Sequence, residues 1–140
     1  MFEPTLNSIV HCKRKRYFLV EGVTDQDRGI YQYATGQKES FGKEGTWRDA
    51  EDGELQGNPI AQGSVDSTVS FKLEMEPDSE NTLYYWIACG ENLEEVKNID
   101  SIVRKTGVEQ LLLETENYWS AWSNTKNLDL TILPRLCEVC

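Results

Sequence analysis

Short apolar runs and alternating positions fill the first ninety residues of the chain. Ile9 to Cys12 and Tyr17 to Val23 are two such runs, and four basic residues, 13–16, separate them. This spacing predicts two adjacent antiparallel strands joined by a tight turn. Residues 29–34 then alternate between apolar and polar side chains, which is typical of a half-buried strand.

The clearest alternation in the chain runs from Val65 to Met75, where apolar side chains mostly occupy the odd-numbered positions. Successive side chains of a strand point to opposite faces, so this pattern predicts one buried and one exposed face. Turn-forming residues 77–81 follow, and residues 82–89 return as a more apolar strand. We predict that the two strands pair as a hairpin and that the second lies in the centre of its sheet.

A long irregular stretch, residues 36–63, separates these strands. It holds six glycines and one proline, a composition that disfavours regular structure. A loop of this length inside a compact domain is usually functional or packed on a partner.

Helical spacing replaces the strand pattern after residue 91. Asn92 with Glu95 three residues later predicts a capped helix start, and Gly107 predicts its end. Apolar residues recur at three- and four-residue steps over 108–122, which predicts a second helix. Pro134 suits the first turn of a further helix. The expected fold class is therefore mainly β with C-terminal helices, with strands in 1–90 and helices in 91–124.

Composition and charge narrow the partners. The 140 residues suit one domain, and the net charge of −10 disfavours binding to nucleic acid or to an anionic membrane surface. No apolar run has the length of a membrane span, and the N-terminal residues lack the order of a secretory signal. Four cysteines do not form a dense disulfide framework, so we expect free thiols and a cytoplasmic location.

Residues 47–54 form the most prominent acidic cluster of the chain. Glycosidases use two carboxylates, one as acid and one as base or nucleophile. A general acid must be buried to hold its proton near neutral pH, whereas Gly53 and Gly57 indicate an exposed loop. The alternative is a solvated loop in which Arg48 pairs with a neighbouring acid.

Two metal sites are also conceivable from spacing alone. Asp49, Glu51, Asp52 and Glu54 resemble a calcium loop only loosely, because no distant glutamate completes the pattern. Cys137 and Cys140 have the spacing of half a zinc site, and His11 is the only histidine that could join Cys12 beside them. We expect no metal, no cofactor and no complete set of catalytic residues in this chain.

Tryptophans are the remaining candidates for ligand contact. Trp86, Trp119 and Trp122 fall in apolar patterns and are expected in the core. Trp47 lies in the long loop and could stack on a sugar ring. The candidate interface or sugar-contacting residues are Trp47, Arg48, Asp49, Glu51, Asp52, Asn58 and Gln62.

Several long stretches together resemble one family. They are RYFLVEG, YQYATG, EGTWRDAEDGELQGNPIAQGSVDSTVSF, LYYWIACG and ENYWSAWSN. They are similar to the N-terminal β-sandwich domain of glycoside hydrolase family 15, which includes prokaryotic glucoamylases, glucodextranases and related trehalases. The resemblance implies an antiparallel β-sandwich portion (a partial supersandwich) over 1–90, a helical linker over 91–124, and the start of a catalytic α/α toroid over 125–140.

The resemblance also implies what the chain lacks. In this family an inverting mechanism uses two glutamates of the toroid, which would follow Cys140, so no catalytic residue is carried over. Earlier sandwich strands would precede Met1. The loop from Trp47 to Ser64 then resembles a docking or pocket-rim element that faces the toroid.

Three hypotheses follow for function. The chain is a non-catalytic accessory and interface domain of a glucoamylase-like hydrolase, with Trp119 and Trp122 packing on the toroid. Alternatively it is a free-standing carbohydrate-binding module for an α-glucan or a glucose-containing oligosaccharide. Alternatively it is a homo-oligomer, because a truncated sandwich has open strand edges that recruit other strands.

Overall fold

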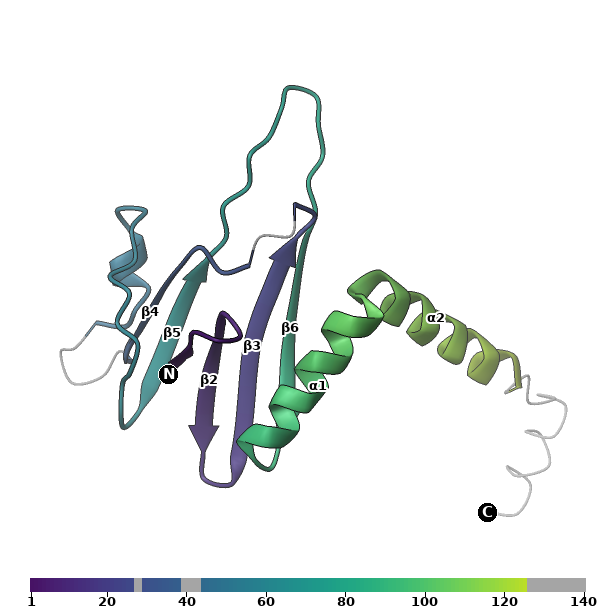
Figure 1. Cartoon of the computed structure of the whole chain (residues 1–140), viewed down its shortest axis with the longest axis horizontal. Helices are drawn as coiled ribbons and strands as arrows, with labels where there is room; N and C mark the ends of the chain where they lie inside the picture. The colour runs from purple at the N-terminus through teal and green to yellow at the C-terminus, as the bar shows by residue number, and fades with distance from the viewer. Residues whose placement is uncertain (27–28, 39–43, 126–140) are drawn as a thin grey trace, which may run out of the picture. The chain divides into compact units, whose positions relative to one another are not determined.

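A computed structural model describes residues 1–26, 29–38 and 44–125 of the chain (Figure 1). Within these ranges, six antiparallel strands form two sheets, and two α-helices follow them. The larger sheet has the order β1-β2-β3-β6 and the smaller sheet pairs β4 with β5. The bounds are β1 Phe2–Glu3, β2 Ser8–Lys13, β3 Arg16–Thr24, β4 Gln32–Gln37, β5 Val65–Ser70 and β6 Leu83–Gly90.

The first predicted strand pair is confirmed. β2 and β3 pair antiparallel with Lys13 opposite Arg16, so only Arg14 and Lys15 form the turn. Arg14 has a φ of 60°, as expected for a two-residue hairpin turn whose twist matches the strands. The predicted strand over 29–34 is displaced, because β4 begins at Gln32.

The predicted hairpin of 65–75 with 82–89 is wrong. β5 ends at Ser70 and pairs with β4 in the smaller sheet. β6 pairs with β3 over its full length, from Leu83 opposite Thr24 to Gly90 opposite Tyr17. β6 is also an edge strand rather than a central one. Its apolar composition reflects an apolar exposed face, with Leu83, Tyr85 and Ile87 all open to solvent.

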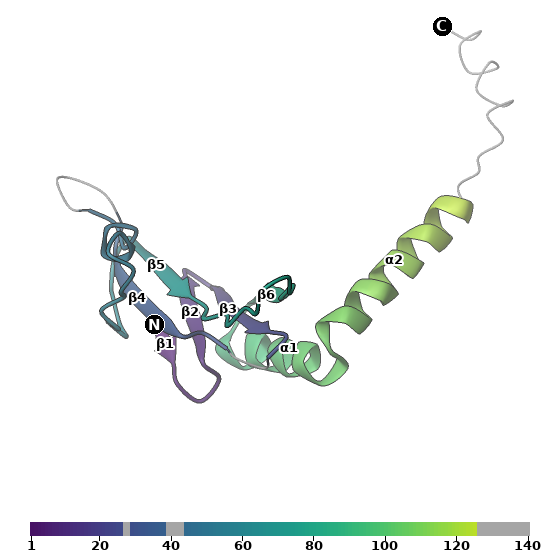
Figure 2. The ribbon, with the colours of Figure 1, turned by 90° about the horizontal axis from the view of Figure 1, so that it is seen from above.

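The two sheets face each other as a β-sandwich-like pair of layers, as expected. Phe2 of β1 stacks on Tyr33 of β4, with ring centroids 3.7 Å apart. The Phe71 ring covers Gly22 of β3 so closely that a Cβ there would lie 2.7 Å from it. Figure 2 shows the larger sheet edge-on between β4–β5 and helix α1 (Leu93–Thr106).

Helix α1 packs on the opposite face of the larger sheet. Leu19 lies three positions from Gly22 on β3 and therefore points to the other side of the sheet. There it joins Val10, Ala88 and the fully buried Val96 of α1 in one cluster. This cluster is the apolar core of the domain.

The helix boundaries are also confirmed. The Asn92 side chain accepts a hydrogen bond from the Glu95 N–H at 2.9 Å. Gly107 ends α1 with a φ of 84°, a left-handed conformation that glycine adopts without a Cβ clash. Helix α2 then spans Val108–Thr125. The predicted third helix and the Cys137–Cys140 pair lie outside the described residues.

The chain divides into two compact units, Met1–Ser101 and Ile102–Cys140. Both sheets belong to the first unit, and α2 belongs to the second. The expectation that Trp119 and Trp122 are core residues is wrong for the described part of the chain, because both are exposed. No helix in the described ranges is long and apolar enough to cross a membrane.

Candidate functional site

The long loop between β4 and β5 folds back along both strands. The Asp66 carboxylate of β5 accepts the Thr46 N–H at 3.1 Å, and the Thr46 and Thr68 hydroxyls lie 2.9 Å apart. On the returning limb, the Thr35 hydroxyl of β4 donates to the Asn58 carbonyl oxygen at 2.8 Å. These hydrogen bonds anchor the loop to the strand residues that face it.

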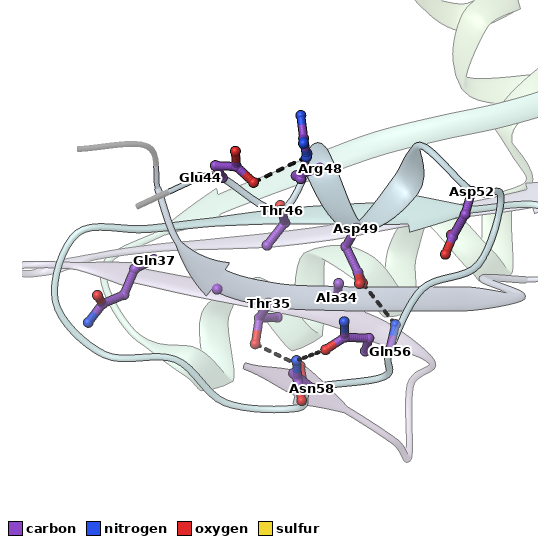
Figure 3. Close-up of a pocket in the computed structure, with 12 residues that line it drawn as sticks. Ala34, Thr35, Gln37, Glu44, Thr46, Arg48, Asp49, Asp52, Gln56 and Asn58 are labelled. Carbon is purple, nitrogen blue, oxygen red and sulfur yellow. Dashed lines mark hydrogen bonds and ion pairs between the residues drawn. The ribbon is translucent and has the colours of Figure 1, made fainter. Parts of the chain in front are cut away.

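A polar hollow of about 390 Å³ lies between the loop and β4 (Figure 3). This loop pocket is near the lower end of the range typical of small-molecule sites, about 300–1,000 Å³. The residues that line it are Ala34, Thr35, Gly36, Gln37, Glu44, Gly45, Thr46, Arg48, Asp49, Asp52, Gln56 and Asn58. Hydroxyl, amide, carboxylate and guanidinium groups therefore surround one small volume.

Four of the seven candidate residues meet at this pocket. Arg48, Asp49, Asp52 and Asn58 line it, whereas Glu51 and Gln62 do not. Trp47 is not a lining residue either, although it directly precedes Arg48 and is 46% exposed. The sequence pointed to the loop that borders this hollow but not to which of its side chains line it.

Hydrogen bonds within the loop hold the acids in place. Asp49 accepts the Gln56 N–H at 2.8 Å, and Asp52 accepts the Glu54 N–H at 2.9 Å. Each carboxylate has a second oxygen, so each retains acceptor capacity for a ligand hydroxyl.

Arg48 has partners on both sides, as the solvated-loop interpretation expected. Its Nε lies 3.1 Å from a Glu44 oxygen and 3.4 Å from a Glu51 oxygen. Its guanidinium carbon also lies 5.9 Å from the centre of the Trp47 ring, within reach of a cation–π attraction. Arg48 therefore contacts both the exposed Trp47 ring and the carboxylates of Glu44 and Glu51.

Sequence reasoning missed three polar residues of the pocket, one from β4 and two from the loop. Thr35, Thr46 and Gln56 contribute side chains to its wall. A threonine in a strand looks like any β-former, so no sequence signal marks Thr35. Only the loop's return to β4 brings Thr35 opposite Asn58.

Two acids lie apart from this pocket, among the core residues of the first unit. Asp100 of α1 is fully buried and accepts the Trp86 indole N–H at 2.9 Å. Burial raises the pKa of Asp100 above its ordinary value, and the Trp86 hydrogen bond partly opposes that rise. Glu21, also buried, lies opposite Trp86 in the strand register. Glu21 lies on the sheet face that α1 covers, and Asp100 reaches that face from α1 through its hydrogen bond to Trp86.

His11 links the two sheets. Its Nε2 lies 2.8 Å from the Ser67 hydroxyl of β5. Burial and the charge of the N-terminal amino group lower the pKa of His11, and Asp66 opposes them. In the described ranges, no three His, Cys, Asp or Glu side chains are grouped to hold a metal ion.

In comparisons with known proteins, no family model, no curated protein and no solved structure matches the chain. The resemblance to family 15 therefore stays a prediction from the sequence.

Proposed function

We propose that the chain is a non-catalytic accessory domain of a glucoamylase-like glycoside hydrolase, acting in cytoplasmic carbohydrate metabolism. Its role is to dock on the helical catalytic domain. The observation that supports this proposal is the apolar face of α2. Five large apolar side chains of this helix are 43–63% exposed: Leu112, Leu113, Tyr118, Trp119 and Trp122.

All but Leu113 belong to one helical face. Leu112, Trp119 and Trp122 lie seven and three residues apart, which places them on one side of the helix. Trp119 packs edge-to-face against both Tyr118 and Trp122, with ring centroids 5.4 and 5.5 Å apart. A contiguous exposed patch of this kind marks an interaction surface.

The resemblance supplies the identity of the partner. In family 15 the segment that corresponds to α2 links the sandwich to the α/α toroid. Aromatic residues dominate the energetics of protein interfaces because they bury large areas. A toroid presents helices, against which the aromatic face of α2 could pack.

Isothermal titration calorimetry can test the docking. The titrant is the toroid of a family 15 glucoamylase prepared without its own sandwich and linker. We expect binding by the full chain, and its loss when Trp119→Ala and Trp122→Ala are combined. The matched control is Leu113→Ala, because Leu113 is exposed on another side of the same helix and should not affect binding. No binding by the wild-type chain, or equal loss in the control, would contradict the proposal.

A second candidate function rests on the loop pocket. Its carboxylate, amide and hydroxyl groups suit the hydroxyls of a neutral sugar, and Trp47 lies beside it as an exposed ring that could stack on the sugar face. In this view the chain binds an α-glucan or a glucose-containing oligosaccharide. Tryptophan fluorescence would be titrated with maltooligosaccharides.

The expected result is a saturable change that Trp47→Ala removes. Trp119→Ala serves as the control, because it deletes another exposed tryptophan that lies outside the pocket. A flat titration of the wild-type chain, or a response that persists in Trp47→Ala, would exclude this function.

A further inference from the structure

Strand β6 is an edge that lacks the usual protection. It has β3 on one side and, within the part of the chain that the structure describes, no strand on the other. Its eight residues, LYYWIACG, include no charged residue and no proline, and its pairing with β3 is continuous, without a bulge. Natural edge strands are normally blunted by charge, proline, a bulge or short length. The opposite edge, β1, has only two residues.

One face of β6 adds exposed apolar side chains to this open edge. Leu83, Tyr85 and Ile87 alternate along the strand and are 39%, 52% and 53% exposed. They lie on the same face as Gly22, which Tyr85 opposes in the register. Phe71, which directly follows β5, covers Gly22, whereas Leu83, Tyr85 and Ile87 stay exposed.

From these features we propose that two copies of the chain pair antiparallel through β6, so that their four-stranded sheets join into one. A twofold axis perpendicular to the sheet keeps the exposed row of each copy on the same side. In such a pair, directly opposed residues must have their side chains on the same face of the joined sheet. A shift of one residue would move the exposed row of one copy to the other face. Two registers lie equally close to the strand centre and pair equally many residues, with Trp86 or Ile87 on the axis; we choose the first because it pairs Tyr85 with Ile87. Tyr85 then lies opposite Ile87 of the second copy, and Leu83 opposite its Cys89.

Cross-strand chemistry favours this register. Aromatic side chains paired with β-branched ones stabilise antiparallel neighbours, and the axis repeats the Tyr85–Ile87 pair twice. The two exposed rows also merge into one apolar patch of six side chains. Each copy carries a net charge of −10, so two copies repel each other over most of their surfaces. Strand β6 has no charged residue, so contact through it brings the fewest like charges together.

Charge at the two ends of β6 favours the antiparallel direction. The basic turn 13–16 lies at the Gly90 end, because Gly90 is opposite Tyr17. Glu91 at this end pairs with Arg16 at 2.9 Å, so the basic character of the end comes from Lys13, Arg14 and Lys15. The Leu83 end carries the acidic residues Glu76, Asp78 and Glu80 in the preceding connection, and the Asp25 carboxylate, which accepts the Thr82 N–H at 2.8 Å. Antiparallel pairing brings the basic end of each copy alongside the acidic end of the other.

This attraction selects orientation more than it adds affinity. β3, which carries the end of the basic turn, lies one strand inside the edge, so it would be about 10 Å from β6 of the second copy. That separation is slightly more than the screening length of about 8 Å at physiological salt. The backbone hydrogen bonds and the apolar row therefore supply most of the stability of the pair.

Sedimentation equilibrium of the full chain across a concentration series can test the pairing. We expect a monomer–dimer equilibrium whose dissociation constant rises about tenfold or more in Ile87→Lys, because lysine on an edge opposes pairing. Ile60→Lys makes the same change at an exposed loop isoleucine and should leave the dimer intact. A wild-type monomer at all concentrations, or equal weakening in both variants, would overturn the proposal.

Disulfide trapping tests the register without weakening the pair. In a chain with Cys12, Cys137 and Cys140 replaced by serine, Leu83→Cys should cross-link to Cys89 of the second copy under mild oxidation, because directly opposed Cα atoms lie within disulfide reach. Leu73→Cys, at an exposed site outside β6, should not. Equal cross-linking in the two variants would refute the register.

The dimer is separable from docking through α2. Trp119→Ala with Trp122→Ala should leave the dissociation constant unchanged. Loss of the dimer in that variant would assign self-association to α2 and would refute pairing through β6.

Discussion

Val96→Ala tests whether α1 is packed on the larger sheet as strongly as its burial indicates. Val96 is fully buried between α1 and the sheet, in contact with the Val10, Leu19 and Ala88 cluster. The change removes two methylene-sized groups, a loss of about 1.6 kcal/mol at about 0.8 kcal/mol each. The unfilled space adds about 1 kcal/mol, and the better helix propensity of alanine returns about 0.5 kcal/mol.

The expected net loss is about 2 kcal/mol in the free energy of unfolding. A domain of this size has a total stability of about 5–15 kcal/mol, so the variant should still fold. Urea unfolding followed by far-ultraviolet circular dichroism should show a midpoint lower by about 1 M, given a slope of about 1–3 kcal/mol per M.

Ile102→Ala provides the matched control. It also replaces a β-branched residue of α1 by alanine, but Ile102 is half exposed. Its midpoint should change by no more than a few tenths of a molar, because little apolar surface is lost. If Val96→Ala lowered the unfolding midpoint no more than Ile102→Ala, Val96 would not be buried against the sheet, and α1 would not be part of the apolar core.

Three further predictions concern single side chains. Burial raises the pKa of Asp100, so the folded chain keeps the carboxyl proton to a higher pH than the unfolded chain. Protonated Asp100 therefore stabilises the fold fully below the ordinary carboxyl pKa of about 3.9. This stabilisation is lost as the pH rises through the raised pKa of the folded chain. Asp100→Asn keeps an acceptor for Trp86 and cannot ionise, so its gain in unfolding free energy over wild type should be larger at pH 7 than at pH 3.5; a gain that does not depend on pH would contradict this. Gly107→Ala should lower stability by about 1–2 kcal/mol in thermal unfolding, because alanine is strained at a φ of 84°; no loss would mean that the helix junction differs. Asp66→Ala removes the acceptor for the Thr46 N–H, so limited proteolysis should cleave residues 44–58 faster than in Asp25→Ala, and equal rates would show that Asp66 does not anchor the loop.

Local sequence signals predicted the helices and the first hairpin because each depends on residues close in the chain. Asn92 caps α1 through the Glu95 N–H, and Gly107 ends it, both within a few residues of the elements they define. The Arg14–Lys15 turn similarly fixes β2 against β3.

Strand partners could not be predicted in the same way. The alternation in 65–75 and the apolar run in 82–89 indicated strands, but neither holds information on which strand lies alongside. β5 and β6 therefore looked like a hairpin although they belong to different sheets. The apolar exposed face of β6 likewise suggested a central strand, because pattern alone cannot distinguish a buried face from an unpartnered one.

The loop pocket was predictable only in part for a related reason. Acidic residues and glycines mark the loop between β4 and β5, and four of its candidate residues do line the hollow. Thr35 contributes the opposite wall through its bond to the Asn58 carbonyl, a contact across 23 residues that depends on the folded strand.

Hydrogen exchange of α2 tests docking most directly. Backbone amides around Trp119 and Trp122 would be followed in the chain alone and after mixing with an isolated family 15 toroid. If α2 docks on the toroid, exchange across residues 112–122 should be slower in the mixture, with β4 and β5 unchanged. Identical exchange rates for α2 in both samples would show that this aromatic face is not the docking surface.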